Sequence, residues 1–458
     1  MIHPPLPGAS ISEGPADWQI LQQGPDGHAT VSLRGVYLTQ APRCRVETRA
    51  VSEADGSLPA GCGDWCAAEM EPGNQWKASL RLPAGGLYRL ETRVWRADCQ
   101  DIRPMRGDYV HHLGVGDLWA IAGQSNASGT GTGPAEDPPE LGLHLFGNDE
   151  TWKLASHPLE DATRSRHPAT VHGVFQAHAP WLNFARQLKR KLGYPIGLIP
   201  CALGGSPIAL WQPGAKCFEN LLEMVRLSGG SVRGIVWHQG ESDAFSRKSA
   251  EYPAGFRGMV KGLRDSLHQE NLPFVTGQLA LWTSAADAEA HREICRMREH
   301  QRQLARELGH EVVPLLDLPI GDEVHLTAQA NLEMGRRYAE TALKEVYGLP
   351  IRSPGIRLLR AERLPQKSPT IRLSFDLGAP GWVKVGNPLE DFSVEDESGA
   401  VPLLAVRPED AGWIDLDLSR NTLGITTVHA HPSARPFPCL RDRDQRPITG
   451  FSERVTGG

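Results

Sequence analysis

The sequence predicts an α/β protein of three domains, in which a largely parallel sheet with helices on both faces lies between two smaller β-sandwich domains. Three observations predict this arrangement. Apolar, strand-like runs alternate with helix-like periodicity from about residue 115 to residue 346. Short segments separated by turn residues fill the regions before and after it. A chain of 458 residues is also longer than one compact core usually takes. The expected domains are 1–110, 111–348 and 349–458.

The N-terminal domain is expected to be a small β-sandwich. Its strand candidates, at 31–36, 45–51, 76–82 and 88–95, are short and partly alternate between apolar and polar residues. Turn residues such as Asp55-Gly56 and Pro72-Gly73 separate them. This close spacing favours a sandwich over a helical domain.

The central domain is expected to have strands at 118–122, 142–146, 196–201, 234–238, 274–281 and 312–316. Apolar residues recur at helical spacing within 181–192, 294–308 and 327–346. Strands that alternate with helices form parallel sheets covered on both faces. Ligands of such sheets bind beyond the carboxyl ends of the strands, so a functional site is expected there.

Pro350 and Pro354 mark the start of the C-terminal domain. Strand-like segments return after them, at 371–375, 382–385, 392–395, 414–418 and 425–428. Their spacing again predicts a small β-sandwich.

Composition and charge exclude two classes of partner. The net charge is −6, from 48 basic and 54 acidic residues, which leaves no footprint for nucleic acid and no basic face for a membrane. No apolar run approaches the ~18 residues of a membrane helix. The N-terminus lacks a basic segment followed by an apolar one, so the cytoplasm is the expected compartment. The sequence leaves the oligomeric state open.

Neither a cofactor nor a metal site is expected. Cys62 and Cys66 form a C-x3-C pair that is compatible with half of a zinc site or with disulfides, but reduced thiols are the favoured interpretation. Four histidines crowd the long segment 149–180, namely His157, His167, His172 and His178. Their spacing matches no metal-ligand pattern. Such a long connector is expected to form a wall of the substrate site.

Ser125 is the candidate nucleophile. The apolar run 118–122 ends in Gly123-Gln-Ser-Asn126, so this serine follows the carboxyl end of a predicted buried strand. There the backbone turns, the side chain can face a crevice, and backbone N–H groups remain unpaired. Gly, Ser and Asn also make ordinary turns, so this segment alone is weak evidence.

Three later segments supply the other parts of an acyl-transfer site. Gly204 and Gly205 can bring a backbone N–H close to a substrate oxygen, and the side-chain amide of Gln239 can donate to an oxyanion. Asp322 and His325 form an Asp-x-x-His segment, in which the imidazole can accept the serine proton while the carboxylate orients the ring. Each signal alone is more typical of turns, caps and ion pairs. Their order, each after a predicted strand of one sheet, indicates a hydrolase site.

The four segments resemble the conserved blocks of the SGNH (GDSL-like) hydrolase superfamily, and more narrowly those of its sialate O-acetylesterase-like carbohydrate esterases. The matching blocks are 123–126, 204–206 with Trp211 downstream, 237–243 and 322–325. Ala127 departs from the many relatives that have Met at this position. The resemblance covers roughly residues 115 to 346 and implies a flavodoxin-like central sheet.

The resemblance also implies an activity, the metal-independent removal of O-acetyl groups from a carbohydrate, either an acetylated oligosaccharide or sialic acid. It implies that Ser125 is the nucleophile, His325 the base and Asp322 the orienting acid. The backbone N–H groups of Ser125 and Gly205 and the side chain of Gln239 would be the oxyanion donors.

Seven residues are expected to contact the substrate: Gln124, Asn126, Trp211, His238, Glu241, Asp243 and Trp282. Trp211 and Trp282 would stack on a sugar ring, with core packing as the alternative for both. Two other functions stay open, an acyl hydrolase that acts on non-sugar esters and a non-catalytic carbohydrate-binding protein. The intact serine, aspartate and histidine disfavour the second.

Overall fold

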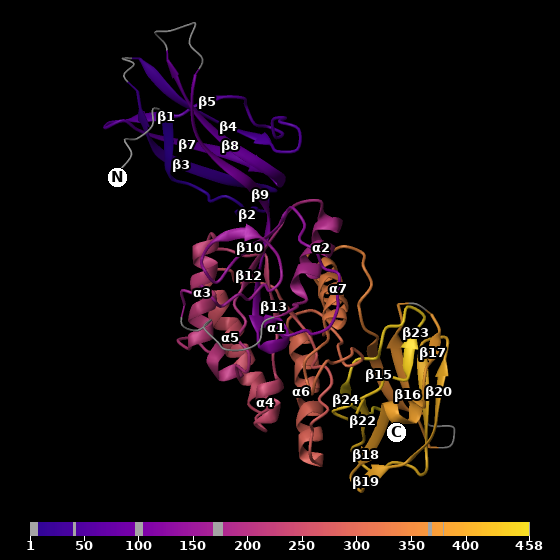
Figure 1. The fold of residues 1–458 in the computed structure, drawn as a ribbon. Coiled ribbons are helices and arrows are strands. Elements are labelled where there is room, and N and C mark those ends of the chain that lie inside the picture. Colours follow the sequence, from indigo (N-terminus) through magenta and orange to yellow (C-terminus); the bar gives the residue numbers. More distant parts are fainter. Residues whose placement is uncertain are drawn as a thin grey trace.

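The computed structural model of the chain describes residues 8–39, 43–96, 104–167, 177–364, 369–378 and 380–457. Figure 1 shows three regions along the chain. An N-terminal β region, in indigo, leads into a central region in which helices surround a sheet. A C-terminal β region, in yellow, lies beside helix α6 (Ala288–Glu307). The protein is therefore a mixed α/β structure with one large mixed sheet and further β-sheet regions.

The large sheet spans the N-terminal and central regions. Its strands are β2 (Ile20–Gln22), β4 (Cys44–Ser52), β5 (Cys66–Ala67), β8 (Gly85–Arg96), β9 (Met105–Gly123), β10 (Leu143–Phe146), β11 (Trp152–Leu154), β12 (Ile196–Pro200), β13 (Gly234–His238) and β14 (Phe274–Thr276). In the central part the order is β11-β10-β12-β9-β13-β14, and all neighbours pair in parallel except β10 and β11. The segment expected as a strand at 312–316 contributes only a parallel bridge from Val313 to Gly277.

One long strand links the N-terminal and central regions. The first half of β9 pairs antiparallel with β8, and the second half pairs in parallel with β12 and β13. Gly116 allows the close approach of β12 at this point, because a Cβ there would lie 1.9 Å from the carbonyl oxygen of Pro195. The expected boundary between residues 110 and 111 therefore falls inside a continuous strand.

Helices cover both faces of the parallel part because alternate side chains of β9 point to opposite faces. Leu118, Ala120 and Ala122 join one apolar core with α3, α5 and α6, whereas Trp119 and Ile121 join another with α2 and α7. The other helices are α1 (Ser125–Ser128), α2 (Trp181–Leu192), 3-10 helix η2 (Ile208–Trp211), α3 (Lys216–Ser228), α4 (Glu241–Phe245), α5 (Tyr252–Leu267) and α7 (Ala328–Glu345). No helix in the described ranges combines the length and apolar character needed to cross a membrane.

A second sheet completes the N-terminal region. Its strands are β1 (Gly8–Glu13), β3 (His28–Leu38), β6 (Glu69–Glu71) and β7 (Gln75–Pro83), in the order β1-β3-β7-β6. Trp76 from β7 and Leu90 from β8 are fully buried in one core that joins residues of both sheets. Cys62 and Cys66 do not pair with each other, since their Sγ atoms donate to the carbonyl oxygens of Arg81 and Asp64.

The C-terminal region consists of antiparallel strands around a separate apolar core. Its elements are β15 (Arg357–Arg363), β16 (Thr370–Asp376), β17 (Trp382–Lys384), η3 (Pro388–Asp391), β18 (Phe392–Asp396), β19 (Gly399–Val401), β20 (Leu403–Glu409), β21 (Trp413–Leu418), β22 (Thr427–Ala430), β23 (Leu440–Asp442) and β24 (Phe451–Arg454). The buried Arg298 of α6 joins this region to the central one. Its guanidinium donates to carbonyl oxygens of Leu279 and Ala280 and of Ser433 and Ala434.

Candidate active site

Strand β9 ends next to Ser125, the candidate nucleophile. Gly123 closes the strand with a φ of +131°, and a Cβ there would lie 2.0 Å from the carbonyl oxygen of His238. Glycine therefore fits where a larger residue would collide with the end of β13. Gln124 then donates its N–H to the same carbonyl oxygen (3.0 Å), and α1 begins at Ser125. The serine thus lies where the carboxyl ends of two neighbouring parallel strands meet.

The Ser125 hydroxyl contacts His325, which lies 200 residues further along the chain. The distance from Ser125 Oγ to His325 Nε2 is 2.9 Å, and that from His325 Nδ1 to Asp322 Oδ2 is 2.7 Å. An ionised carboxylate can only accept, so the ring proton lies on Nδ1 and Nε2 can accept from the hydroxyl. This arrangement can remove the proton from a serine that attacks an ester.

Backbone N–H groups fix the Asp322 carboxylate. Its Oδ1 accepts from the N–H groups of Val324 (2.8 Å) and His325 (2.7 Å). Partial burial alone would raise the pKa of Asp322, but these bonds and the His325 ring outweigh it and hold the pKa below its usual value. The carboxylate therefore stays ionised at neutral pH. Thr327 then caps α7, because its Oγ1 accepts from the Ala330 N–H (3.1 Å).

Asn126 joins the segment around Ser125 to the segment around His325. Its Nδ2 donates to Glu241 Oε1 (2.9 Å) and to the carbonyl oxygen of Val324 (3.2 Å), and its Oδ1 accepts from the Leu326 N–H (3.0 Å). Asn126 is only 2% exposed. The expectation that it contacts the substrate is therefore corrected, because all its contacts hold the site together.

Replacing Asn126 with alanine is expected to lower turnover by about tenfold, because the His325 segment loses its tie to α1. The change also leaves the Leu326 N–H without a partner and removes one of the two contacts of Glu241 Oε1, so the free energy of unfolding should fall by about 2 kcal/mol. Ester hydrolysis and urea unfolding measure the two effects. Asn183→Ala is the matched control, since Asn183 is a buried amide that donates to the Leu332 carbonyl oxygen away from the site. The Asn183→Ala variant should lose stability but keep its turnover. Equal turnover losses in both variants would contradict the role of Asn126 in holding the His325 segment next to α1.

Two backbone N–H groups near Ser125 are available to a substrate oxygen. In the part of the chain that the structure describes, neither the Ser125 nor the Gly205 N–H donates a hydrogen bond. Gly205 is exposed and has a φ of +69°. Its segment is held against β9 because Leu203 N–H (3.0 Å) and Ser206 Oγ (3.3 Å) both donate to the Gly123 carbonyl oxygen. Free N–H groups in such a position can stabilise an oxyanion.

The Gln239 side chain is already engaged within the protein. It is fully buried, and its Nε2 donates to Asp243 Oδ2 (2.6 Å), the Ser206 carbonyl oxygen (3.1 Å) and Gln124 Oε1 (3.2 Å). A carboxamide nitrogen has two N–H bonds, and these acceptors use both. The expectation that Gln239 donates directly to an oxyanion is therefore corrected.

Gln124 has its amide oxygen fixed and its amide nitrogen unused. Its Oε1 accepts from Gln239 Nε2 and from the N–H groups of Gly240 (3.4 Å) and Ser242 (3.2 Å). Its Nε2 donates to no residue that the structure describes, and it is not among the enclosed atoms without a partner. Gln239 thus helps to orient a second amide, which directly precedes Ser125.

Four of the expected substrate contacts are buried side chains that are engaged within the protein. Trp211 is fully buried, with its ring edge-to-face with Trp237 at 5.1 Å and its Nε1 donating to Ser206 Oγ. It therefore cannot stack on a sugar. His238, Glu241 and Asp243 are also corrected, because their side chains contact other protein groups, namely Tyr338, Asn126 and Gln239 in turn. They form a polar layer beneath the site, in which His238 Nε2 lies 3.4 Å from Glu241 Oε1.

Trp282 is the expected substrate contact with an accessible side chain. Its ring packs against that of Phe245, with 4.1 Å between the centroids, and Phe245 is 42% exposed. Thr283, the next residue, donates its N–H to the Glu323 carbonyl oxygen (2.9 Å) within the Asp322–His325 segment. The pair therefore lies at the rim of the site. Sequence reasoning missed Phe245. Its place four residues after Glu241, an expected substrate contact, was a usable signal, because residues four apart lie on the same face of a helix.

The connector at 149–180 contributes a buried ion cluster. Asp137 Oδ2 lies 2.8 Å from His157 Nε2 and 3.3 Å from His178 Nε2, and Arg186 binds its other oxygen. The ligand atoms of Asp137, His157 and His178 lie close enough together to hold a metal ion. However, His157 Nδ1 accepts from the Ala179 N–H (3.3 Å), which leaves its Nε2 protonated and donating to Asp137. His172 lies outside the described residues.

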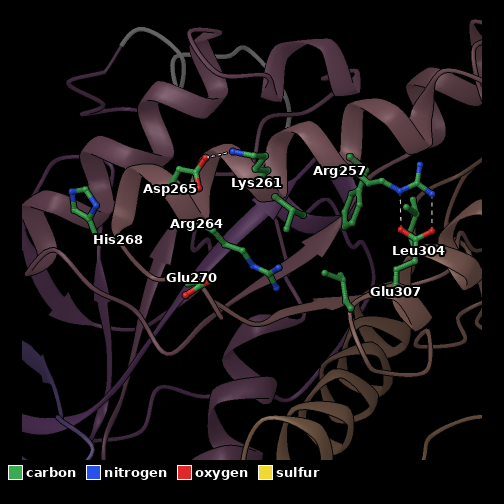
Figure 2. A pocket seen from close by; sticks show the side chains of 11 residues that line it. Arg257, Lys261, Arg264, Asp265, His268, Glu270, Leu304 and Glu307 are labelled. Atoms are coloured by element: carbon green, nitrogen blue, oxygen red, sulfur yellow. Dashed lines mark hydrogen bonds and ion pairs between the residues drawn. The ribbon is translucent and has the colours of Figure 1, made fainter.

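A groove of about 710 Å³ between α5 and α6 is lined by neither Ser125 nor His325. Figure 2 shows two charged pairs in it, Arg257 with Glu307 and Lys261 with Asp265, and Arg264 donates to the Leu272 carbonyl oxygen. We therefore assign no chemistry to this groove.

Comparison with known proteins gives one family match. A family model described as "carbohydrate esterase, sialic acid-specific acetylesterase" matches residues 115–344, which is half of the chain. A probable carbohydrate esterase of Arabidopsis thaliana is 28% identical over 250 residues, which are 49% of this chain and 90% of that protein. The sialate O-acetylesterase of Homo sapiens is 25% identical over 198 residues, which are 35% of this chain and only 37% of that protein.

A solved structure resembles nearly the whole chain. A carbohydrate acetylesterase from Xanthomonas citri aligns with a TM-score of 0.66 over 96% of this chain and 98% of that one, at 19% sequence identity. At this identity the likeness shows a shared fold.

Proposed function

We propose that this chain, which belongs to the family of carbohydrate esterases described as sialic acid-specific acetylesterases, is a serine esterase that removes O-acetyl groups from carbohydrates. Membership makes it a carbohydrate esterase and agrees with the resemblance of its four sequence blocks. The observation that carries the mechanism is the 2.9 Å contact between Ser125 Oγ and His325 Nε2, with Asp322 on the other ring nitrogen.

Ser125, His325 and Asp322 divide the work of acyl transfer. His325 Nε2 takes the hydroxyl proton while Ser125 Oγ forms a bond to the acetyl carbonyl carbon. The tetrahedral intermediate then breaks its bond to the sugar oxygen, which receives the proton from His325. Water, deprotonated by His325, attacks the acetyl-Ser125 ester, and acetate leaves as Ser125 regains its proton. Asp322 stabilises the imidazolium in both halves.

The oxyanion donors we propose are the Ser125 and Gly205 N–H groups, with the free amide of Gln124 as the side-chain donor. Gln239 then acts through Gln124, because it donates to the Gln124 amide oxygen and helps to orient the nitrogen. Gln124→Glu keeps the accepting oxygen but removes the N–H2 group. We expect it to lower kcat by about 100-fold with little change in KM, since one oxyanion donor commonly contributes roughly 3 kcal/mol.

Steady-state hydrolysis of p-nitrophenyl acetate measures the Gln124 prediction. Gln187→Glu is the control, because Gln187 is a partly exposed glutamine of α2 that donates to Asn183 Oδ1. It should hydrolyse the ester at the wild-type rate. A Gln124→Glu variant that loses only substrate affinity, with kcat unchanged, would contradict the donor role.

We also propose a finer description of the fold. The central domain is flavodoxin-like, the flanking regions are β-sandwiches, and the domains span 1–110, 111–348 and 349–458. The spatial order β12, β9, β13, β14 and the Val313 bridge supports the flavodoxin-like core, because with β10 left aside it corresponds to the order 2-1-3-4-5 in the chain.

The substrate is expected to be an acetylated oligosaccharide or an acetylated sialic acid. Trp282 and Phe245 provide an aromatic rim near His325 on which a sugar ring can pack. Sialate O-acetylesterases are among the relatives, which makes sialic acid one candidate.

Acetate release from a panel of acetylated substrates tests the proposed function. The panel contains O-acetyl sialic acid, acetylated xylo-oligosaccharides and a short-chain triglyceride. We expect acetate from at least one sugar and a much lower rate on the triglyceride. A preference for the triglyceride would favour the alternative of a non-sugar acyl hydrolase, and no hydrolysis of any ester would favour a binding protein.

A further inference from the structure

On the sheet face formed by β4 and β8, arginine alternates with glutamate. β4 has the sequence Arg45-Val-Glu-Thr-Arg49 and β8 has Arg89-Leu-Glu-Thr-Arg93. Side chains two residues apart on a strand share a face. The antiparallel register places Glu47 opposite Arg93 and Arg49 opposite Glu91, so charges of opposite sign alternate both along and across the strands.

The carboxylates of this face lie beneath the guanidinium groups. Glu47 contacts Arg45 (2.7 Å) and Arg93 (2.6 Å), and Glu91 contacts Arg49 (2.7 Å) and Arg89 (2.6 Å). The two glutamate side chains are 4% and 9% exposed, whereas the four arginine side chains are 23–50% exposed. The surface presented to solvent is therefore cationic, in a chain whose net charge is −6.

A pocket of about 570 Å³ lies on this face. We call its wall the arginine face, which consists of Arg49, Trp65, Arg89, Arg93, Arg106 and Tyr109. Among the described residues that line the pocket Glu91 is the one acid, and outside the lining Arg49 also pairs with Asp64 (2.8 Å) and Arg93 with Glu47 (2.6 Å). Arg106 of β9 lies opposite Arg93 and forms no ion pair with any residue that the structure describes. Of the described arginines of this face, Arg106 is therefore the one whose guanidinium is free to take a ligand.

Aromatic rings accompany the guanidinium groups. Those of Arg49 and Arg93 lie 4.4 and 3.9 Å from the ring centroid of Trp65. Tyr109 stands next to them, opposite Glu91 on the neighbouring strand. Planar guanidinium forks match a carboxylate with two parallel hydrogen bonds, and the cation–π contacts hold them in place. Aromatic rings beside them suit the apolar face of a sugar.

We propose that the arginine face binds the carboxylate-bearing residue of an acidic oligosaccharide. The pocket shares no residue with the site around Ser125, so this binding is separate from the esterase reaction. The choice of a sugar as the carrier of the carboxylate rests on the proposed function. Both a uronic acid and a sialic acid have the required chemistry.

Calorimetric titration of the full chain tests this proposal. The Ser125→Ala variant is used so that no ester hydrolysis contributes heat. The probes are trigalacturonic acid and sialyllactose, each with its neutral counterpart, galactotriose and lactose. We expect one or both acidic probes to bind, their neutral counterparts not to bind, and the affinity to fall as salt is raised. The stronger of the acidic probes distinguishes a uronate from a sialate.

Arg106→Ala should weaken the binding of the acidic probe by about tenfold or more, because a charged fork to the carboxylate is lost. Arg106 is exposed and unpaired, so this variant should fold normally. Arg190→Ala is the matched control, an exposed arginine on α2, and should bind as before. In the active chain, Arg106→Ala should hydrolyse p-nitrophenyl acetate at the wild-type rate, so loss of this site and loss of the esterase are distinguishable.

Any one of four results would overturn the proposal. The acidic probes fail to bind, or the neutral sugars bind equally well, or Arg106→Ala binds as tightly as the parent chain. Equal binding of a short single-stranded DNA would also overturn it, because the face would then attract any polyanion rather than a sugar acid.

Discussion

The Ser125→Ala variant is expected to lose at least about 10⁴-fold in kcat/KM for p-nitrophenyl acetate and for the best acetylated sugar. Without the hydroxyl no acetyl-enzyme can form, and His325 has no proton to accept. The oxyanion donors remain, so a small rate above the uncatalysed one should persist. Initial rates at saturating and at low substrate concentration measure both constants.

The fold should survive this substitution, because Ser125 Oγ contacts His325 at the rim of the site and belongs to neither apolar core. Ser128→Ala is the matched control. Ser128 is a buried serine of the same short helix whose Oγ donates to the Ser125 carbonyl oxygen, but it does not reach His325. Its turnover should stay within about tenfold of the wild type. Comparable losses in the two variants would mean that the short helix matters only for structure.

The Asp322→Asn variant is expected to lower kcat by about 10⁴-fold while the geometry is retained. A carboxylate accepts from His325 Nδ1–H and so leaves Nε2 unprotonated toward Ser125. A carboxamide can donate to Nδ1, which favours the tautomer with the proton on Nε2, and such a ring cannot accept the serine proton. Glu323→Gln is the control, since Glu323 is an exposed acid in the same segment and should keep its rate.

The pH dependence of turnover provides a second test of Asp322. Its pKa is held below the usual value by the N–H groups of Val324 and His325, which outweigh partial burial. A carboxyl group with a lowered pKa contributes fully to the free energy of unfolding above its usual pKa. This contribution is lost as pH falls through the lowered value, where the group becomes protonated. Protonation of Asp322 should therefore reduce turnover only on the far acid side.

Local spacing predicts part of this site because some contacts lie within one turn. Asp322 and His325 are three residues apart, so the carboxylate can reach both the ring and the backbone N–H groups around it. The contact between Ser125 and His325 is not local. It was inferred from the rule that ligands gather at the carboxyl ends of parallel strands, and the alternating core residues of β9 made that sheet predictable.

The burial of a side chain and the register between strands could not be predicted from the sequence. Trp211 and His238 lie at or after strand ends as a substrate contact would, yet Trp211 packs in the core with residues of α3 and α5, and His238 contacts Tyr338 of α7. Likewise, the alternation of arginine and glutamate on β4 is visible in the chain, but only the register with β8 shows that each glutamate pairs with arginines of both strands. The continuity of β9 across the expected domain boundary also depends on pairing partners distant in sequence.

Labelling with a fluorophosphonate followed by peptide mass mapping is the most direct test of Ser125 as an activated nucleophile. Such a reagent phosphonylates a serine only where a base removes its proton and donors hold the developing negative charge. We predict one phosphonyl group on the peptide that contains Ser125, full loss of esterase activity with it, and no label in the Ser125→Ala or His325→Ala variants. Complete labelling of another residue, with inactivation and with Ser125 unmodified, would contradict the account.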